Sequence, residues 1–185
     1  MYYISPLRVT EEQISGLVKK KSSGSLSRFL DKKEANILQS DLIFYPYWIS
    51  LIEASFKRPF LKDRIIKQCY AVDGCEGKIN MVEGKIDTVT TDENSKKFLK
   101  PKIGIKKAED IITSAGKNKL MYKYKQVPVI SISEIELIYK PKWVVKYQVE
   151  REIKHLIIDG DTAQISYNEN ILRTLNSMQS PLKED

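Results

Sequence analysis

The sequence predicts an α+β fold of two tandem duplicated units, each a helix packed on an antiparallel β-sheet. Three observations support this prediction: a motif repeated around each of two tryptophans, a repeated Asp-Gly turn, and a proline with a helical pattern ahead of each copy. We expect the first unit to cover residues 1–92 and the second, which includes a C-terminal helix over 168–178, to cover residues 93–185. The chain has 185 residues, 42% of them hydrophobic, so it can bury a substantial core.

The repeat consists of two motifs in the same order. The tryptophan motif at residues 42–49 recurs 95 residues later at residues 137–144, with the pattern L-I-aromatic-x-P-x-W-aliphatic. The turn motif that begins at Asp73 recurs only 86 residues later, at Asp159. Between its two motifs the first copy therefore holds nine more residues than the second.

Each copy is expected to begin with an amphipathic helix. The first covers residues 10–20, where Thr10 is a candidate N-cap and the acidic residues that follow suit the helix dipole. The second covers residues 105–115, and Gly116 favours its end at that point.

After each helix the hydrophobic periodicity changes to two, which is typical of strands. In the second copy we expect a strand over residues 137–150, a return strand over 153–158 that closes on the Asp-Gly turn, and a short strand over 163–167. An extra strand over residues 127–132 precedes them.

Few residues suggest catalysis. The single histidine, His155, alternates with aliphatic residues in a predicted strand, and we interpret it as structural. Asp73 and Asp159 recur, but an Asp-Gly pair suits a tight turn, in which Asp bonds its own backbone and Gly takes a positive φ. Cys69 and Cys75 lack a second pair that would complete a metal site, and no glycine-rich nucleotide-binding loop is present. We therefore predict a non-enzymatic protein with no metal and no cofactor.

The tryptophan strand of the first copy is apolar on both sides, whereas the second copy has lysines at matching positions on one side. Such a strand must be covered by the other copy, by its own helix, by a twin subunit or by a partner protein. We take this apolar side as the candidate contact surface for a protein partner or homo-oligomer. Its residues are Ile43, Tyr45, Tyr47, Ile49 and Leu51.

The basic charge is concentrated in residues 96–125, where ten lysines and two acidic residues give a local net charge of +8, against +7 for the whole chain. Lysines interleaved with tyrosines can follow a phosphate backbone and stack bases. The segment lacks arginine, however, which makes the bidentate phosphate contacts. Nucleic-acid binding is therefore the alternative hypothesis, and its candidate residues are Lys117, Lys119, Tyr122, Lys123, Tyr124 and Lys125.

No segment has the composition of a membrane span. The longest apolar stretch, residues 42–52, has about 11 residues and contains a proline, whereas a spanning helix needs roughly 18. The first residues also lack the basic and then apolar pattern of a secretory signal. We expect a cytoplasmic protein with reduced cysteines and no membrane partner.

A helix that leads into an antiparallel hairpin with the turn D-G-x-x-G-K-I, as at residues 73–79, resembles the PepSY-like and cystatin-like α+β modules of bacteria. Residues 159–165 match this turn less closely because Ala163 replaces its second glycine. The resemblance implies a binding or inhibitory module without catalytic residues, often located outside the cytoplasm. It assigns no site residues.

Overall fold

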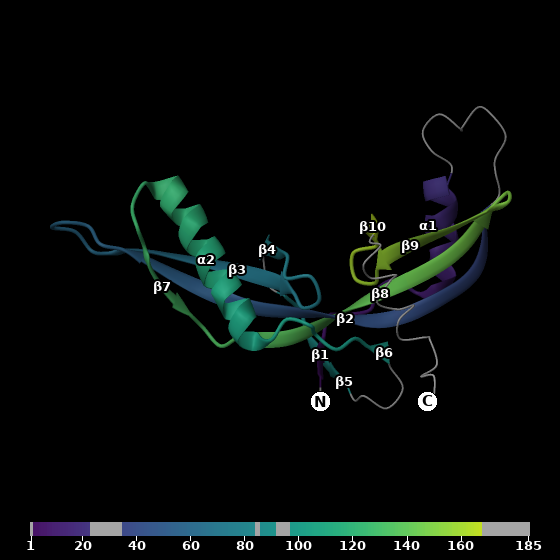
Figure 1. Ribbon diagram of the computed structural model, residues 1–185, viewed down its shortest axis with the longest axis horizontal. Helices are drawn as coiled ribbons and strands as arrows, with labels where there is room; N and C mark the ends of the chain where they lie inside the picture. The colour runs from purple at the N-terminus through teal and green to yellow at the C-terminus, as the bar shows by residue number, and fades with distance from the viewer. Residues whose placement is uncertain (1, 23–34, 84–85, 92–96, 168–185) are drawn as a thin grey trace, which may run out of the picture. The chain divides into compact units, whose positions relative to one another are not determined.

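The computed structural model describes residues 2–22, 35–83, 86–91 and 97–167 (Figure 1). Within these ranges it has two helices, α1 (Glu11–Ser22) and α2 (Ile105–Tyr124). The strands are β1 (Tyr2–Ile4), β2 (Ala35–Phe56), β3 (Arg64–Asp73), β4 (Ile79–Val82), β5 (Val89–Thr91), β6 (Lys97–Phe98), β7 (Val129–Ile132), β8 (Glu136–Val149), β9 (Glu152–Asp159) and β10 (Ile165–Ser166). The predicted C-terminal helix over residues 168–178 lies outside the described residues.

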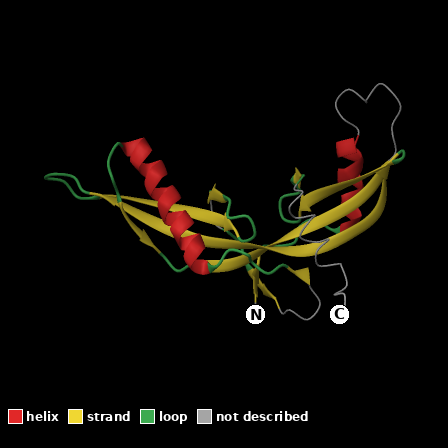
Figure 2. Cartoon of the chain, in the orientation of Figure 1, coloured by secondary structure: helices red, strands yellow, loops and turns green. Residues whose placement is uncertain are grey.

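The predicted fold class is wrong. All ten strands in the described ranges belong to one mixed sheet, whose main strand order is β10-β9-β8-β2-β3-β4, and Figure 2 shows that strand predominates over helix. β1 pairs with β5 and β8, while β6 and β7 pair with β2. The two long tryptophan strands, β2 and β8, are neighbours in this order, so both hairpins join a single sheet instead of forming two separate helix-on-sheet units.

A set of hydrogen bonds connects the β2–β3 hairpin to the segment ahead of α2. The N–H of Gly74 donates to the carbonyl of Pro46 (2.9 Å), and the carbonyl of Gly74 accepts from the N–H groups of Lys102 and Ile103 (2.8 Å each). The carbonyl of Ile103 in turn accepts from Nε1 of Trp48 (2.7 Å). We call these hydrogen bonds the docking set of the hairpin. Because Pro46 and Trp48 both lie on β2, the docking set begins and ends on the same strand.

The β8–β9 hairpin carries an equivalent docking set. The N–H of Gly160 donates to the carbonyl of Pro141 (2.8 Å), and the carbonyl of Gly160 accepts from the N–H groups of Arg8 and Val9 (2.8 Å each). The carbonyl of Val9 accepts from Nε1 of Trp143 (2.9 Å). The two tryptophans of the chain therefore hold equivalent places in their hairpins, as the repeat predicts.

The chain divides into two compact units, each of which contains one docking set. Unit 1 comprises Met1–Ser5 and Phe44–Lys140, and unit 2 comprises Pro6–Ile43 and Pro141–Asp185. Each unit combines the hairpin of one repeat copy with the helix of the other. The expected domain boundary between residues 92 and 93 separates the two copies of the sequence repeat. The two units of the structure are discontinuous in sequence and have no boundary at that position.

In unit 2, α1 packs on the β8–β9 hairpin. Ile14 and Val18, one helical turn apart, are each 1% exposed and share a core with Trp143, Val145 and Leu156. Residues one turn apart share a face of a helix, and alternate residues share a face of a strand. The apolar residues that recur with helical periodicity and those that recur with strand periodicity thus pack together in this core.

In unit 1, α2 packs on β2 and β3. Ala108, Ile112 and Leu120 on the helix are fully buried, in a core that includes Ile52. Gly116 lies on the same helix face, and a Cβ added to it would come within 2.3 Å of Cδ1 of Ile52. The prediction that Gly116 ends the helix is wrong, because this glycine instead allows the helix to approach the sheet closely.

Gly74 and Gly160 are predicted to be essential for the docking sets. A Cβ added to either one would lie 2.9 Å from the carbonyl oxygen of Pro46 or Pro141 respectively. We expect Gly74→Ala and Gly160→Ala each to lower the free energy of unfolding by about 1–3 kcal/mol, because the turn must move away from the proline carbonyl. Urea unfolding followed by tryptophan fluorescence measures this change.

Gly16 on α1 provides the matched control, since a Cβ added there has no atom within 4 Å beyond its chain neighbours and the backbone of its own helix. We expect Gly16→Ala to raise the free energy of unfolding by about 0.5–1 kcal/mol through helix propensity. Equal effects of the alanine substitution at Gly16 and Gly74 would show that close approach to the proline is unimportant.

Candidate functional site

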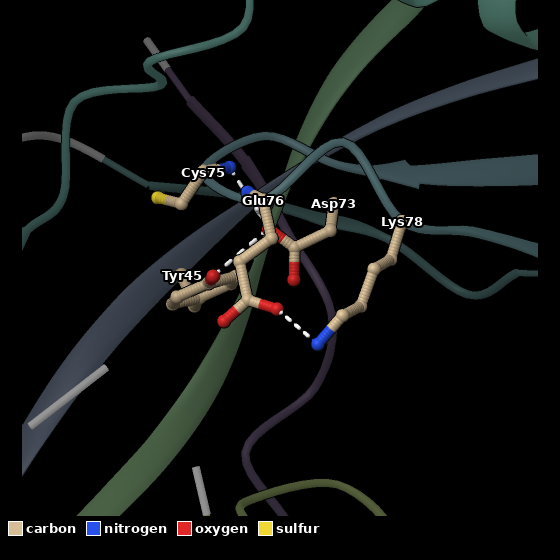
Figure 3. Close-up of polar contacts among 5 residues, drawn as sticks. All are labelled: Tyr45, Asp73, Cys75, Glu76 and Lys78. Carbon is tan, nitrogen blue, oxygen red and sulfur yellow. Dashed lines mark hydrogen bonds and ion pairs between the residues drawn. The ribbon is translucent and has the colours of Figure 1, made fainter. Parts of the chain in front are cut away.

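Figure 3 shows a polar cluster centred on Asp73, which is 8% exposed. Its Oδ1 accepts three hydrogen bonds of 2.8 Å: from the hydroxyl of Tyr45 and from the backbone N–H groups of Cys75 and Glu76. The two backbone donors belong to the turn that follows β3, and the tyrosine comes from the neighbouring strand β2. The carboxylate therefore fastens this turn to the sheet.

Burial affects two titratable groups in the cluster. It raises the pKa of the Tyr45 hydroxyl far above its ordinary value of 10.0, and the negative charge of Asp73 raises this pKa further. Burial also raises the pKa of the Cys75 thiol above its ordinary value of 9.0. Both groups therefore keep their protons at neutral pH, and Cys75 lacks the thiolate form that a nucleophilic cysteine requires.

Glu76 and Lys78 form an ion pair between Oε2 and Nζ, seen at the lower edge of the cluster in Figure 3. The Glu76 side chain is only 10% exposed, whereas that of Lys78 is 70% exposed. The glutamate raises the pKa of Lys78 through a hydrogen bond and its charge. A buried carboxylate is costly without a counter-charge, so Lys78 offsets part of the cost of burying Glu76.

The corresponding turn in unit 2 uses the same backbone device. Oδ1 of Asp159 accepts from the N–H groups of Asp161 (3.1 Å) and Thr162 (3.0 Å). The prediction of an Asp-bonded turn is thus confirmed in both copies. The predicted positive φ is at the wrong glycine, however, because the left-handed residues are Gly77 (φ 72°) and Ala163 (φ 59°).

The predicted contact face is only partly accessible. Ile43 and Tyr45 are 0% and 1% exposed, so they are core residues, and Ile43 belongs to unit 2 while the other four belong to unit 1. Tyr47 and Ile49 are half-buried, and Leu51 is 41% exposed. The accessible part of this strand therefore starts at Tyr47.

Leu51 lies on the sheet face opposite α2, because strand residues alternate between faces and its neighbour Ile52 belongs to the core beneath α2. Strand pairing places Leu51 beside Cys69, and Ser55 beside both Ile65 and Val129. The helix of unit 1, α2, packs on the other side. We call it the open face; its apolar residues are Tyr47, Ile49, Leu51, Ile65, Cys69, Ala71, Val82 and Val129.

The basic candidate residues lie on α2 or directly after it. Those that are exposed are Lys117, Lys119, Tyr122, Lys123 and Lys125. Tyr124 is instead half-buried, with its ring centroid 5.1 Å from that of Phe56 and 4.4 Å from the guanidinium carbon of Arg64. Folding therefore places Arg64 against the basic segment of residues 96–125, which contains no arginine of its own.

One exposed feature has no counterpart among the residues predicted from the sequence. The loop between β2 and β3, residues 57–63, is the free end of its hairpin in Figure 1 and is called the tip loop below. Phe60 in this loop is 105% exposed and Leu61 is 66% exposed. The signal that could have revealed it is the nine-residue excess of the first copy, which falls in this hairpin.

The other candidate groups form no site. His155 is exposed on β9 and does not share the burial of Ile157. In the parts of the chain that the structure describes, no group of three or more His, Cys, Asp or Glu side chains is arranged to hold a metal ion. Nor does either helix in those parts combine the length and apolar character needed to cross a membrane.

No family model, curated protein or solved structure matches the chain. The resemblance to PepSY-like and cystatin-like modules accordingly stays a prediction.

Removal of the Tyr45 hydroxyl should weaken the Asp73 cluster. We expect Tyr45→Phe to lower the free energy of unfolding at pH 7 by about 1.5–3 kcal/mol, since the buried carboxylate then has one hydrogen bond fewer. The raised pKa of Tyr45 makes folding favour its protonated form, so this stability is fully present below about pH 10 and is lost as the pH rises further. Urea unfolding between neutral and alkaline pH should therefore show a steeper alkaline decline for the wild type, by up to about 1.4 kcal/mol per pH unit. Parallel curves would contradict this role for Tyr45.

Proposed function

We propose that the protein is a non-enzymatic binding protein that acts through protein–protein contacts at the open face. The observation that carries this proposal is the exposure of apolar side chains on three strands: Leu51 is 41%, Ile65 57% and Val129 63% exposed. Covering such side chains with another surface removes them from water, which favours association.

The polar cluster supports a non-enzymatic role. The Oδ1 atom of Asp73 is used by three donors that hold the turn in place, and Tyr45 and Cys75 stay protonated at neutral pH. These groups stabilise the fold, and the same carboxylate-to-backbone bonds recur at Asp159. A feature that both units share is better explained by the fold than by chemistry at one site.

The charges on the open face favour a second copy of the chain as the partner. Glu53 and Lys67 lie opposite each other on β2 and β3, with Oε2 and Nζ 3.1 Å apart, and their charges offset each other. A polyanion gains little from such a surface. A second copy related by two-fold symmetry presents the same apolar rows, and Lys67 of each copy can face Glu53 of the other.

Charged substitutions on the open face test this contact. We expect Leu51→Lys and Ile65→Lys each to weaken self-association at least about a hundredfold, because two apolar side chains are no longer buried in every dimer. Both side chains are partly exposed, so the fold should be retained, as circular dichroism can verify. Sedimentation equilibrium measures the association.

Leu38→Lys is the matched control, since Leu38 is 44% exposed on β2 but belongs to unit 2. This variant should associate as the wild type does. A wild-type chain that is monomeric at all concentrations would refute self-association through the open face.

Nucleic-acid binding is the second candidate, and the exposure of Lys117, Lys119, Lys123 and Lys125 on or directly after α2 favours it. If the lysines of α2 bind phosphates, the affinity for mixed-sequence DNA or RNA should fall steeply with salt concentration. We expect the combined change of Lys117, Lys119, Lys123 and Lys125 to Gln to flatten the slope of log K against log salt by roughly 0.7–0.9 for each phosphate that is no longer neutralised. Fluorescence anisotropy measures the slope, and Lys154→Gln in unit 2 is the control. An affinity that does not depend on salt would rule out this candidate.

A further inference from the structure

The two hairpins of the chain differ in length although they share a docking set. From Trp48 the β2–β3 ladder continues for nine residue pairs to Phe56 and Arg64, and seven loop residues follow. From Trp143 the β8–β9 ladder continues for seven pairs, and two loop residues close it. The nine extra residues thus comprise four in the ladder and five in the loop. Since the second hairpin closes without them, the fold does not require this extension.

Internal hydrogen bonds hold the tip loop in a defined turn. The Arg58 guanidinium donates to the carbonyl of Lys62 through Nε (2.9 Å) and Nη2 (2.6 Å), and the N–H of Leu61 donates to the carbonyl of Arg58 (3.3 Å). Phe60 has φ 65°, in the left-handed region that favours glycine. The backbone conformation therefore does not favour a phenylalanine at this position. The presence of this residue must be explained by what its side chain contacts.

The side chains of Phe60 and Leu61 do not contribute to the core. Phe60 is 105% exposed, and Leu61 beside it is 66% exposed. Two adjacent apolar side chains at the end of a hairpin are unfavourable in water. Transfer of these side chains into another apolar phase or surface is therefore favourable.

Cationic residues flank this apolar pair along the chain, and further cations lie at the base of its hairpin. The end of α2 lies against the base of the hairpin, where Nε2 of Gln126 donates to the carbonyl of Lys57 (2.7 Å) and the ring of Phe56 packs at 5.1 Å from that of Tyr124. Asp63, within the loop, is an acidic residue that accepts from Ser55 Oγ (3.3 Å). We call these exposed cations the collar; they are Lys57, Arg58, Lys62, Arg64, Lys123 and Lys125.

We infer that the tip loop docks on the surface of an anionic phospholipid membrane. Phe60 and Leu61 enter the boundary between headgroups and acyl chains, and the collar contacts the negatively charged headgroups. Such a contact needs no spanning helix, which is why the length of apolar stretches in the sequence did not indicate it. It goes beyond the proposed protein contact at the open face.

The tip suits a lipid surface better than a nucleic acid. Stacking on bases requires free aromatic faces; Phe60 offers one, but Leu61 beside it has none. The two tyrosine rings nearby already face cations, with Nζ of Lys125 4.2 Å from the Tyr122 centroid and the Arg64 guanidinium carbon 4.4 Å from the Tyr124 centroid. An aromatic and an aliphatic side chain with flanking cations match an anionic lipid interface.

Co-sedimentation of the full chain with vesicles tests the inference. We expect binding to vesicles of phosphatidylcholine mixed with phosphatidylserine and much weaker binding to phosphatidylcholine alone. Phe60→Gly should lower the affinity for the mixed vesicles at least about tenfold, because one apolar side chain is no longer buried. Glycine suits the left-handed backbone at this position, so the variant should unfold at the same or a higher urea concentration than the wild type.

Matched variants separate the apolar and the charged parts of the contact. Leu61→Ser should weaken vesicle binding, whereas Ile153→Ser, at a 55% exposed position on β9, should not. The double variant Lys57→Gln, Lys62→Gln should weaken binding by about fivefold for each charge removed. The same charge change at Lys106 and Lys107, at the opposite end of α2, should have little effect.

A tryptophan in place of Phe60 reports insertion directly. We expect the fluorescence of Phe60→Trp to shift to shorter wavelength when mixed vesicles are added, with no such shift in the wild type. The inference is overturned if the wild type does not bind mixed vesicles, or if Phe60→Gly binds them as tightly as the wild type. It is also overturned if the tip variants lose affinity for DNA or RNA but keep their affinity for vesicles, since the tip is then a nucleic-acid contact.

Discussion

The hydrogen bond from the glycine N–H of each Asp-Gly turn to a proline carbonyl is the contact on which the rest of the structure depends. It brings the turn so close to the neighbouring strand that a Cβ at Gly74 or Gly160 would lie 2.9 Å from the proline carbonyl oxygen. The carbonyl of the same glycine then accepts two N–H groups from the segment ahead of a helix. The helix that follows is thereby aligned over the hairpin, where its apolar face is buried.

The docking sets distinguish residues that hold the fold together from residues that are available for binding. The carboxylates of Asp73 and Asp159 both bond the backbone of their turns, so both serve the docking sets. Unit 1 departs from unit 2 in its apolar open face and in its longer hairpin. The two units share one hydrogen-bonding scheme. Features found in only one of them are therefore not required by that scheme and are the better candidates for binding.

These features share a physical character. The open face and the tip loop expose apolar side chains whose removal from water favours association. They differ in their charges, since the ion pair of Glu53 and Lys67 leaves the open face balanced while the collar gives the tip an excess of positive charge. The balanced surface suits a protein, and the positive one suits an anionic partner.

The sequence by itself determined the local structure of this protein. Periodicity predicted α1, the start of α2 and the tryptophan strands, and turn chemistry predicted the role of Asp73, because these depend on residues a few positions apart. Only the tertiary structure decided that one sheet forms and that the hairpin of each copy holds the helix of the other. The deciding bonds join Trp48 to Ile103 and Trp143 to Val9, which are 55 and 134 residues apart, and no local pattern specifies such partners. The burial of Ile43 and Tyr45 and the exposure of the tip follow from that long-range pairing for the same reason.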